Sequence, residues 1–272
     1  MAGRLHIADI NVDLLLAAAE LPPLRIKTPL LTHPNRAPRH PTSIIALAED
    51  GIPELRAAFW GLTPAWLKQL DKAPHCARVE ALNSRPMNRT ARHRRCAVPV
   101  TGIYAWATQP GCKQSGRKQP FMITRVDRRP ILLAGVCDVY PDPTAALNPA
   151  FTAPARRQHR ASAPPSLACQ PRDHESFALI TVKSNALIAP LSERLPAIVE
   201  PSRLAAWLSP DTAPEAACAL LATAPLEMLG LFPVSRAISA PSCQEWHLSQ
   251  PIGPMRTADD EGNTSTPRPP LH

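Results

Sequence analysis

Two groups of residues in the first half of the sequence could act on a nucleic acid. Trp60 and Trp66 lie six residues apart in the segment F-W-G-L-T-P-A-W (59–66), around a glycine and a proline. Aromatic rings presented on a turn can stack unpaired bases, each worth roughly 1–3 kcal/mol in single-strand binders. The window that follows is basic and holds His75, Arg78, Arg85, Arg89, Arg92, His93, Arg94 and Arg95. Charge at this density is typical of a phosphate track, with a solvated loop and core tryptophans as the alternatives.

Five further segments follow in a fixed order along the chain. They are C-A-R-V-E at 76–80 followed by N-S-R-P, R-R-C-A-V-P-V-T-G-I-Y-A-W at 94–106, F-A-L-I-T at 177–181, L-S-E-R-L-P at 191–196 and F-P-V-S-R-A-I at 232–238. With the tryptophan segment, their order and spacing resemble the SOS response-associated peptidase (SRAP) family from Met1 to Pro251, apart from Tyr140 to Ser176. Members of this family process abasic sites in single-stranded DNA. The resemblance implies an α+β domain with a curved, barrel-like sheet flanked by short helices, and a role in the response to DNA damage.

The chain departs from the family pattern at each reactive position. Family members begin M-C-G-R and carry N-A-R-x-E-T, G-x-Y-E-W or G-x-F-E-W, and H-D-R-M-P or close variants. In this chain Ala2 replaces the cysteine, Cys76 the asparagine, Ala105 the glutamate and Ser192 the histidine. In the family the terminal cysteine traps the ring-opened sugar aldehyde as a thiazolidine, which needs its sulfur. Because these alanines and this serine supply neither a thiol nor a group that titrates near neutral pH, we expect no such covalent link.

The framework around these positions matches the family. The matching residues are Gly3, Arg4, Trp60, Gly61, Pro64, Trp66, Arg78, Glu80, Tyr104, Trp106, Arg194 and Pro196. From the resemblance and the basic window, we expect DNA contacts from Arg4, Trp60, Trp66, Arg78, Arg85, Trp106 and Arg194. The same comparison implies that Gly3, Glu80 and Tyr104 shape the cleft. Internal ion pairs of the arginines and core packing of the tryptophans are the alternatives, and no metal or cofactor is expected.

Three functions are compatible with these residues. The favoured one is binding of single-stranded or junction DNA, abasic sites included, without a covalent link. If Met1 is removed, the freed amine of Ala2, with a pKa of about 7.7–8, could form a Schiff base with an abasic aldehyde and promote strand cleavage. The third is a protein-interaction module in which the Arg/Pro-rich segment 151–172 docks a partner that the sequence does not identify. We interpret Cys76 as a small buried thiol filling the asparagine volume rather than as a relocated nucleophile.

Many short elements are predicted to position these residues. Asp9 to Glu20 is expected to be a helix with Asp9 as N-cap, stopped by Pro22-Pro23. Expected strands are 4–8, 43–47, 56–60, 96–99, 102–106, 121–126, 131–136, 177–182 and 197–199, and further helices are expected at 184–189, 202–208 and 214–222. Residues 1–251 are expected to form one domain carrying a flexible Pro/Ala/Arg-rich insertion at 141–176, with a disordered tail at 252–272.

Composition sets the broad class of the protein. The chain has 272 residues, a hydrophobic content of 44% and a net charge of +8, which favours a globular protein with a polyanionic partner. With 34 prolines and 10 glycines, long helices are not expected. The seven cysteines lie far apart without C-x-x-C spacing, which predicts neither a disulfide framework nor a zinc site. Reduced thiols, and the lack of an apolar run long enough to cross a bilayer, predict a cytoplasmic protein that does not enter membranes.

Overall fold

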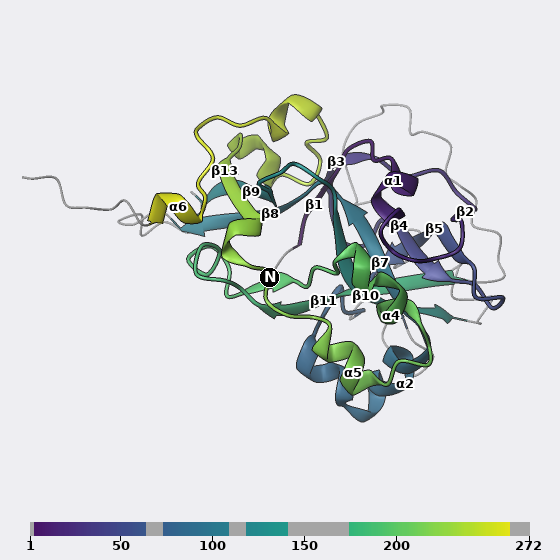
Figure 1. Cartoon of the computed structure of the whole chain (residues 1–272). Coiled ribbons are helices and arrows are strands. Elements are labelled where there is room, and N and C mark those ends of the chain that lie inside the picture. The colour runs from purple at the N-terminus through teal and green to yellow at the C-terminus, as the bar shows by residue number, and fades with distance from the viewer. Residues whose placement is uncertain (1–2, 64–72, 109–117, 141–173, 262–272) are drawn as a thin grey trace, which may run out of the picture.

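The computed structural model of the chain describes residues 3–63, 73–108, 118–140 and 174–261 (Figure 1). Its strands are β1 Leu5–Ile7, β2 Arg25–Ile26, β3 His33–Arg36, β4 Pro41–Leu47, β5 Pro53–Trp60, β6 Cys76–Arg78, β7 Arg95–Val100, β8 Gly102–Thr108, β9 Lys118–Arg125, β10 Ile131–Tyr140, β11 His174–Lys183, β12 Arg194–Pro196 and β13 Leu229–Pro233. Its α-helices are α1 Val12–Leu16, α2 Arg85–His93, α4 Leu204–Leu208, α5 Pro214–Ala219 and α6 Ala258–Glu261. Short 3-10 turns include η2 Val79–Asn83, η4 Pro201–Arg203, η5 Leu226–Met228, η6 Arg236–Ser239 and η7 Trp246–Ser249.

The strands form two sheets. The smaller sheet has the order β13-β9-β8-β1-β3, and the larger has the order β12-β11-β10-β7-β4-β5-β2, with β6 paired to β11. A parallel pairing of β5 with β11, through Ser176 opposite Phe59 and Phe177 opposite Trp60, closes five strands of the larger sheet into a ring. Mixed sheets with a few short helices make an α+β fold, as predicted.

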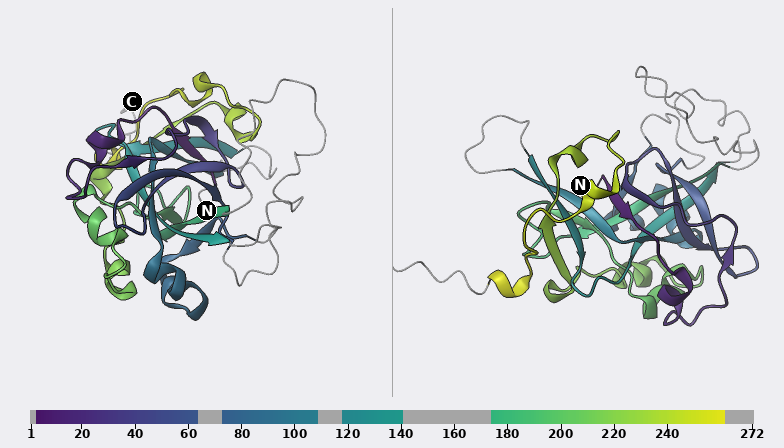
Figure 2. Two further views of the ribbon diagram at one scale, coloured as in Figure 1. Left: turned by 90° about the vertical axis from the view of Figure 1, so that its right-hand side faces the viewer. Right: turned by 90° about the horizontal axis from the view of Figure 1, so that it is seen from above.

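Three apolar clusters hold these layers together. The first lies between the two sheets and includes Leu5 and Ile103 from the smaller sheet and Val98 and Phe177 from the larger one. The second packs the four helices α1, α2, α4 and α5 against the larger sheet, and the third packs the segment after β13 against the smaller sheet. Helices α2 and α5 lie side by side at one edge of the molecule (Figure 2).

Several predicted elements differ from the structure. The helix expected at 9–20 is only the five-residue α1, and its N-cap is Asn11, whose side chain accepts a hydrogen bond from the Leu14 amide at 2.9 Å, so Asp9 was the wrong cap. The helix expected at 184–189 is a set of turns in which Asn185 Oδ1 accepts from the Ile188 amide. The strand expected at 197–199 is reduced to a single bridge between Ile198 and Leu133, because the pairing with β11 is made by β12 just before it.

Most of the expected insertion at 141–176 and of the expected tail at 252–272 lies outside the described residues. The parts that are described belong to ordered elements. Residues 174–176 open β11, which continues in register with β10 from His174 opposite Tyr140. Residues 258–261 form α6, and Arg256 bridges to Leu231 in β13.

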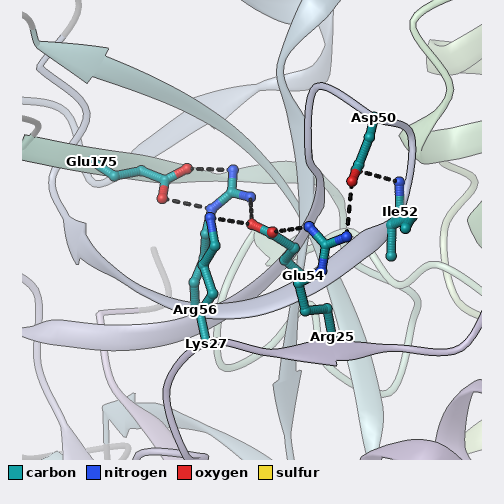
Figure 3. Close-up of polar contacts among 7 residues, drawn as sticks. All are labelled: Arg25, Lys27, Asp50, Ile52, Glu54, Arg56 and Glu175. Carbon is teal, nitrogen blue, oxygen red and sulfur yellow. Dashed lines mark hydrogen bonds and ion pairs between the residues drawn. The ribbon is translucent and has the colours of Figure 1, made fainter.

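A chain of ion pairs fixes the ring where β5 meets its neighbours (Figure 3). Glu54 on β5 is 1% exposed and accepts from Lys27 at 2.8 Å, Arg25 at 3.0 Å and Arg56 at 3.1 Å. Arg56 in turn forms two 2.7 Å hydrogen bonds with Glu175 of β11. Burial alone would raise the pKa of Glu54, but hydrogen bonds from Lys27 and Arg25 outweigh burial and hold it below its usual value. The network therefore ties β2, β5 and β11 together.

Candidate functional site

Two of the four substituted positions lie together in one cavity. Ala105 of β8 and Ser192, which precedes β12, line a cavity of about 190 Å³ although they are far apart in sequence. Tyr104, Trp106 and Arg194, which the resemblance assigns to the cleft or to DNA, also line it. The rest of the wall consists of Ile103, Lys118, Ile123, Leu191 and Leu195. The sequence-based prediction of a shared site therefore brings together five of its residues here.

The cavity wall carries little acid–base chemistry. Ala105 presents only a methyl group and is 7% exposed. The hydroxyl of Ser192 donates to the Arg194 carbonyl at 2.7 Å, which fixes the turn before β12. Among the described residues no carboxylate or imidazole lines this cavity. The wall has two basic side chains, Lys118 and Arg194, and the charge of Arg194 is already paired with Glu80.

Four hydrogen bonds hold the Arg194 guanidinium in place. Its guanidinium donates to the two carboxylate oxygens of Glu80 at 2.9 and 3.3 Å, and to the carbonyl and hydroxyl of Thr181 at 2.6 and 3.2 Å. The pKa of Glu80 is lowered by its own backbone amide and then by Arg194. Its carboxylate is 58% exposed, whereas Arg194 is 10% exposed. The pair is the internal brace that the sequence left open as an alternative, and it joins η2, β11 and β12.

Arg4, Tyr104 and Trp106 are tied to the segments around them. Arg4 donates to Asn35 Oδ1 at 2.9 Å and to the carbonyls of Ile238 and Ser239, and its guanidinium lies 5.9 Å from the centre of the Trp106 ring. The Trp106 indole donates to the Ser239 hydroxyl at 3.0 Å. Tyr104 is fully buried, and its hydroxyl donates to the Pro34 carbonyl at 2.7 Å. These contacts hold β1 and β8 against η6 and β3.

The two tryptophans of the first segment have different outcomes. Trp60 is fully buried, lies nearly parallel to Phe177 across the ring closure, and donates its indole hydrogen to the His75 carbonyl at 2.8 Å. A base could stack on this ring only by displacing the core, so we do not expect Trp60 to contact DNA. Trp66 and Ala2 lie outside the described residues. Gly3, the first described residue, has open space around its Cα on the Cβ side.

The basic window divides into exposed and buried residues. Arg78, Arg92 and His93 are exposed, and Arg94 lies 3.6 Å from Asp138. Arg95 was wrongly included in a phosphate track, because it is 3% exposed and donates to the carbonyls of Trp207, Ala91, Ser209 and Thr212. Arg85 opens α2, but the predictions for its side chain and that of Arg89 fall outside what the structure describes.

Cys76 begins β6, opposite Leu179 of β11. It is half-buried, and burial raises the pKa of its thiol to about 12. Because the thiolate is the reactive form, a thiol with this pKa is a poor nucleophile at neutral pH. The geometry therefore supports the interpretation of Cys76 as a packing residue.

Sequence reasoning missed Lys118, the first residue of β9. It pairs with Thr108 of β8 and lines the cavity beside Trp106. Its only signal in the sequence was a position just before the strand expected at 121–126, and that signal does not distinguish it from a surface lysine. Among the described residues no group of three His, Cys, Asp or Glu side chains could hold a metal ion, and no helix there is long and apolar enough to cross a membrane.

The arrangement of the two sheets and the short helices is shared with solved structures of other proteins. A solved structure from Bacteroides thetaiotaomicron has a TM-score of 0.68 and 17% identity, covering 92% of this chain and 99% of that chain. A second, from Bordetella bronchiseptica, has a TM-score of 0.61 and 17% identity, covering 86% and 100%. Likeness at this identity shows a shared α+β fold.

Sequence comparison identifies the family to which the chain belongs. Residues 1–241 match the family described as SOS response associated peptidase (SRAP), and the chain belongs to this family. The abasic site processing protein YedK of Escherichia coli is 26% identical over 216 residues, covering 78% of this chain and 82% of that protein. The abasic site processing protein YMR114C of Saccharomyces cerevisiae is 25% identical over 178 residues, covering 63% and 39%.

Proposed function

We propose that this protein acts in the cytoplasm in the response to DNA damage, by binding single-stranded DNA, including abasic and junction forms, without forming a thiazolidine crosslink. Membership of the SRAP family and similarity to two abasic site processing proteins support the DNA-damage role. The net charge of +8 supports a polyanionic partner. The substitution at position 2 supports the non-covalent mode, because a thiazolidine ring needs a sulfur that alanine lacks.

One observation carries this proposal. Ala105 and Ser192 replace the family's glutamate and histidine, and both line the same cavity while Arg194, Trp106 and Tyr104 remain around it. A positioned acid or base is typically worth about 10²- to 10⁴-fold in rate. At positions 105 and 192 this chain has neither the glutamate nor the histidine that could serve as one. The frame of the site is retained and its proton-transfer groups are not, which favours binding over chemistry.

Binding and covalent capture are separated by one pair of measurements. Fluorescence anisotropy with labelled intact and abasic single strands, at increasing salt, should show binding that weakens steeply with salt. Denaturing gel electrophoresis of the same mixtures should show no attached strand. Undetectable binding at low salt refutes the DNA role, and a detergent-resistant adduct of the unmodified protein refutes the non-covalent mode.

Restoring the family residues tests whether the site is still a competent cleft. The combined variant Ala2→Cys, Cys76→Asn, Ala105→Glu and Ser192→His should gain a denaturation-resistant complex with abasic DNA, whereas Ala2→Cys combined with the native Ala105 and Ser192 should gain less. Borohydride treatment of the native protein on abasic DNA distinguishes the lyase alternative, because a Schiff base on the Ala2 amine would be reduced to a stable adduct.

A further inference from the structure

Arg36 differs from the other arginines that are at least half-buried. It is the last residue of β3, its side chain is half-buried, and its Nε is sealed from solvent without a hydrogen-bond partner. Burial with no opposing charge lowers the pKa of Arg36 to about 10. The comparable arginines of the described chain all donate to acids or to oxygens of the protein, and they are Arg4, Arg56, Arg95, Arg125 and Arg194. Because a partly buried charge without a counter-charge is costly, an anion bound at this position would be stabilising.

The register of the smaller sheet puts Arg36 on the face that carries the candidate site. Arg36 pairs with Leu5, and Leu5 pairs with Ile103 of β8. Paired residues of antiparallel strands share a face, and side chains two residues apart along a strand share it too. Leu5 and Ile103 face the other sheet, and so does Ala105, two residues further along β8. Arg36 therefore lies on the edge strand β3, at the end of the cross-strand row of Arg36, Leu5 and Ile103, and Ile103 lines the cavity.

The chain after Arg36 leads to the segment of Cys76. The Arg39 amide donates to the Trp60 carbonyl at 2.8 Å, and the Trp60 indole donates to the His75 carbonyl at 2.8 Å. The end of β3 is thus held next to the start of β1, with which it pairs, and next to the start of β6, two segments that carry family positions. Arg36 belongs to the same part of the molecule as the substituted residues.

The neighbours of Arg36 do not provide the missing negative charge. His33, on the same strand, has its pKa lowered to about 4 by burial first and then by the positive charges of Arg36 and His40, so it is neutral at pH 7. Its Nδ1 accepts from the Asn35 amide at 2.9 Å, and a neutral imidazole carries no negative charge that could pair with Arg36. Among the described residues no acid forms an ion pair with Arg36.

We propose that Arg36 binds a phosphodiester group of the DNA strand that passes the candidate site, an inference that rests on the proposed function. A guanidinium presents a planar fork of donors that matches phosphate oxygens, and it is less strongly hydrated than an ammonium group. The strand phosphate supplies the counter-charge that the protein does not. Arg36 is thus a DNA-positioning residue that neither the charge pattern of 75–95 nor the family motifs include.

The test compares two single variants, each of which removes one positive charge. Arg36→Leu removes the proposed contact, and Arg203→Leu is the matched control, because Arg203 is an exposed arginine on η4 and its loss changes the net charge equally. Anisotropy with a labelled abasic single strand should show about tenfold weaker binding for Arg36→Leu, and a salt dependence shallower by about 0.7 in log–log slope. Arg203→Leu should stay within about twofold of the native protein.

Thermal unfolding without DNA distinguishes a ligand contact from a structural one. Since Arg36→Leu removes an uncompensated buried charge, it should melt at or above the temperature of the native protein. Inorganic phosphate should raise the melting temperature of the native protein more than that of Arg36→Leu. Unchanged affinity of Arg36→Leu, an equal loss in Arg203→Leu, or a loss accompanied by a lower melting temperature overturns the proposal. Failure of the native protein to bind any strand at low salt is instead a failure of the proposed function and needs no variant to detect.

Discussion

Replacing Glu54 by glutamine should lower the free energy of unfolding by about 3 kcal/mol, at the low end of the 3–5 kcal/mol typical of breaking a buried ion pair. The carboxylate is 1% exposed and serves three cations. Arg56 retains Glu175 after the change, while Lys27 and Arg25 are 56% and 44% exposed and regain water. These recoveries are why the loss stays at the low end. At about 2–4 °C per kcal/mol for a chain of this size, the melting temperature should fall by about 6–12 °C.

Calorimetry or circular dichroism over a pH series measures this effect. The pKa of Glu54 is lowered in the folded protein, so its contribution is present above its unfolded value of 4.5 and is lost as the pH falls through the folded value. The gap between native and Glu54→Gln melting temperatures should therefore narrow below pH 4.5. Asp50→Asn is the matched control, because Asp50 is 50% exposed and its pair with Arg25 is screened by water, so its loss should change stability far less. A gap that stays constant into acid, or that equals the effect of Asp50→Asn, refutes this reasoning.

Three further outcomes are expected. Arg194→Met should lower the free energy of unfolding in urea by about 2 kcal/mol, because it leaves the Thr181 carbonyl and hydroxyl without their donor. Glu80→Gln should lower it by less than about 1 kcal/mol, since Glu80 is largely exposed, and equal losses for the two variants would argue against the brace. Trp60→Ala should cost about 3–5 kcal/mol, and a near-neutral result in the same assay would contradict the core position of this ring. The thiol of Cys76, with its pKa raised to about 12, should react with iodoacetamide at pH 7.5 at least about tenfold more slowly in the folded protein than in urea. Peptide mass spectrometry follows the reaction, and equal rates in the two states would show an accessible thiolate.

The sequence predicted the strands that carry strong apolar patterns. The expected strands at 43–47, 56–60, 96–99, 102–106, 121–126, 131–136 and 177–182 fall on β4, β5, β7, β8, β9, β10 and β11. Most of their β-branched and aromatic residues are buried in the clusters around the two sheets, so local pattern and tertiary packing agree there, whereas Val126 at the end of the expected strand 121–126 is exposed. The α+β class and the family followed from the order of the motifs and are confirmed.

Elements held mainly by tertiary contacts were not predictable. β3, with the sequence H-P-N-R, has no strand-like pattern and exists because it pairs with β1 and because Asn35 donates to three carbonyls of the C-terminal segment. α2 contains four basic residues and a proline and reads as a polar track, yet Met87 and Ala91 bury one of its faces. In both cases long-range packing outweighs the local preference.

The candidate site was predictable in membership more than in roles. The family motifs grouped Ala105, Ser192, Trp106 and Arg194 in one site, and in the structure all four line one cavity because the motifs lie on or beside the strands that form it. The same reasoning could not distinguish a phosphate ligand from a brace, since both use a buried arginine beside polar groups. Only the partners of each guanidinium separate Arg194, which is fully engaged, from Arg36, which is not.

The parallel pairing of β5 with β11 has a consequence for synthesis on the ribosome. β5 ends at Trp60, whereas its partner is not translated until Phe177 has been added. Over that stretch of elongation the end of β5, at Phe59 and Trp60, lacks the backbone partner that β11 later provides. β6, which carries Cys76, pairs only with β11 among the described strands and must wait as long. Unpaired strand edges invite association with other nascent chains. The protein should therefore need sheltering by chaperones until its last third emerges, and chains truncated before β11 should aggregate.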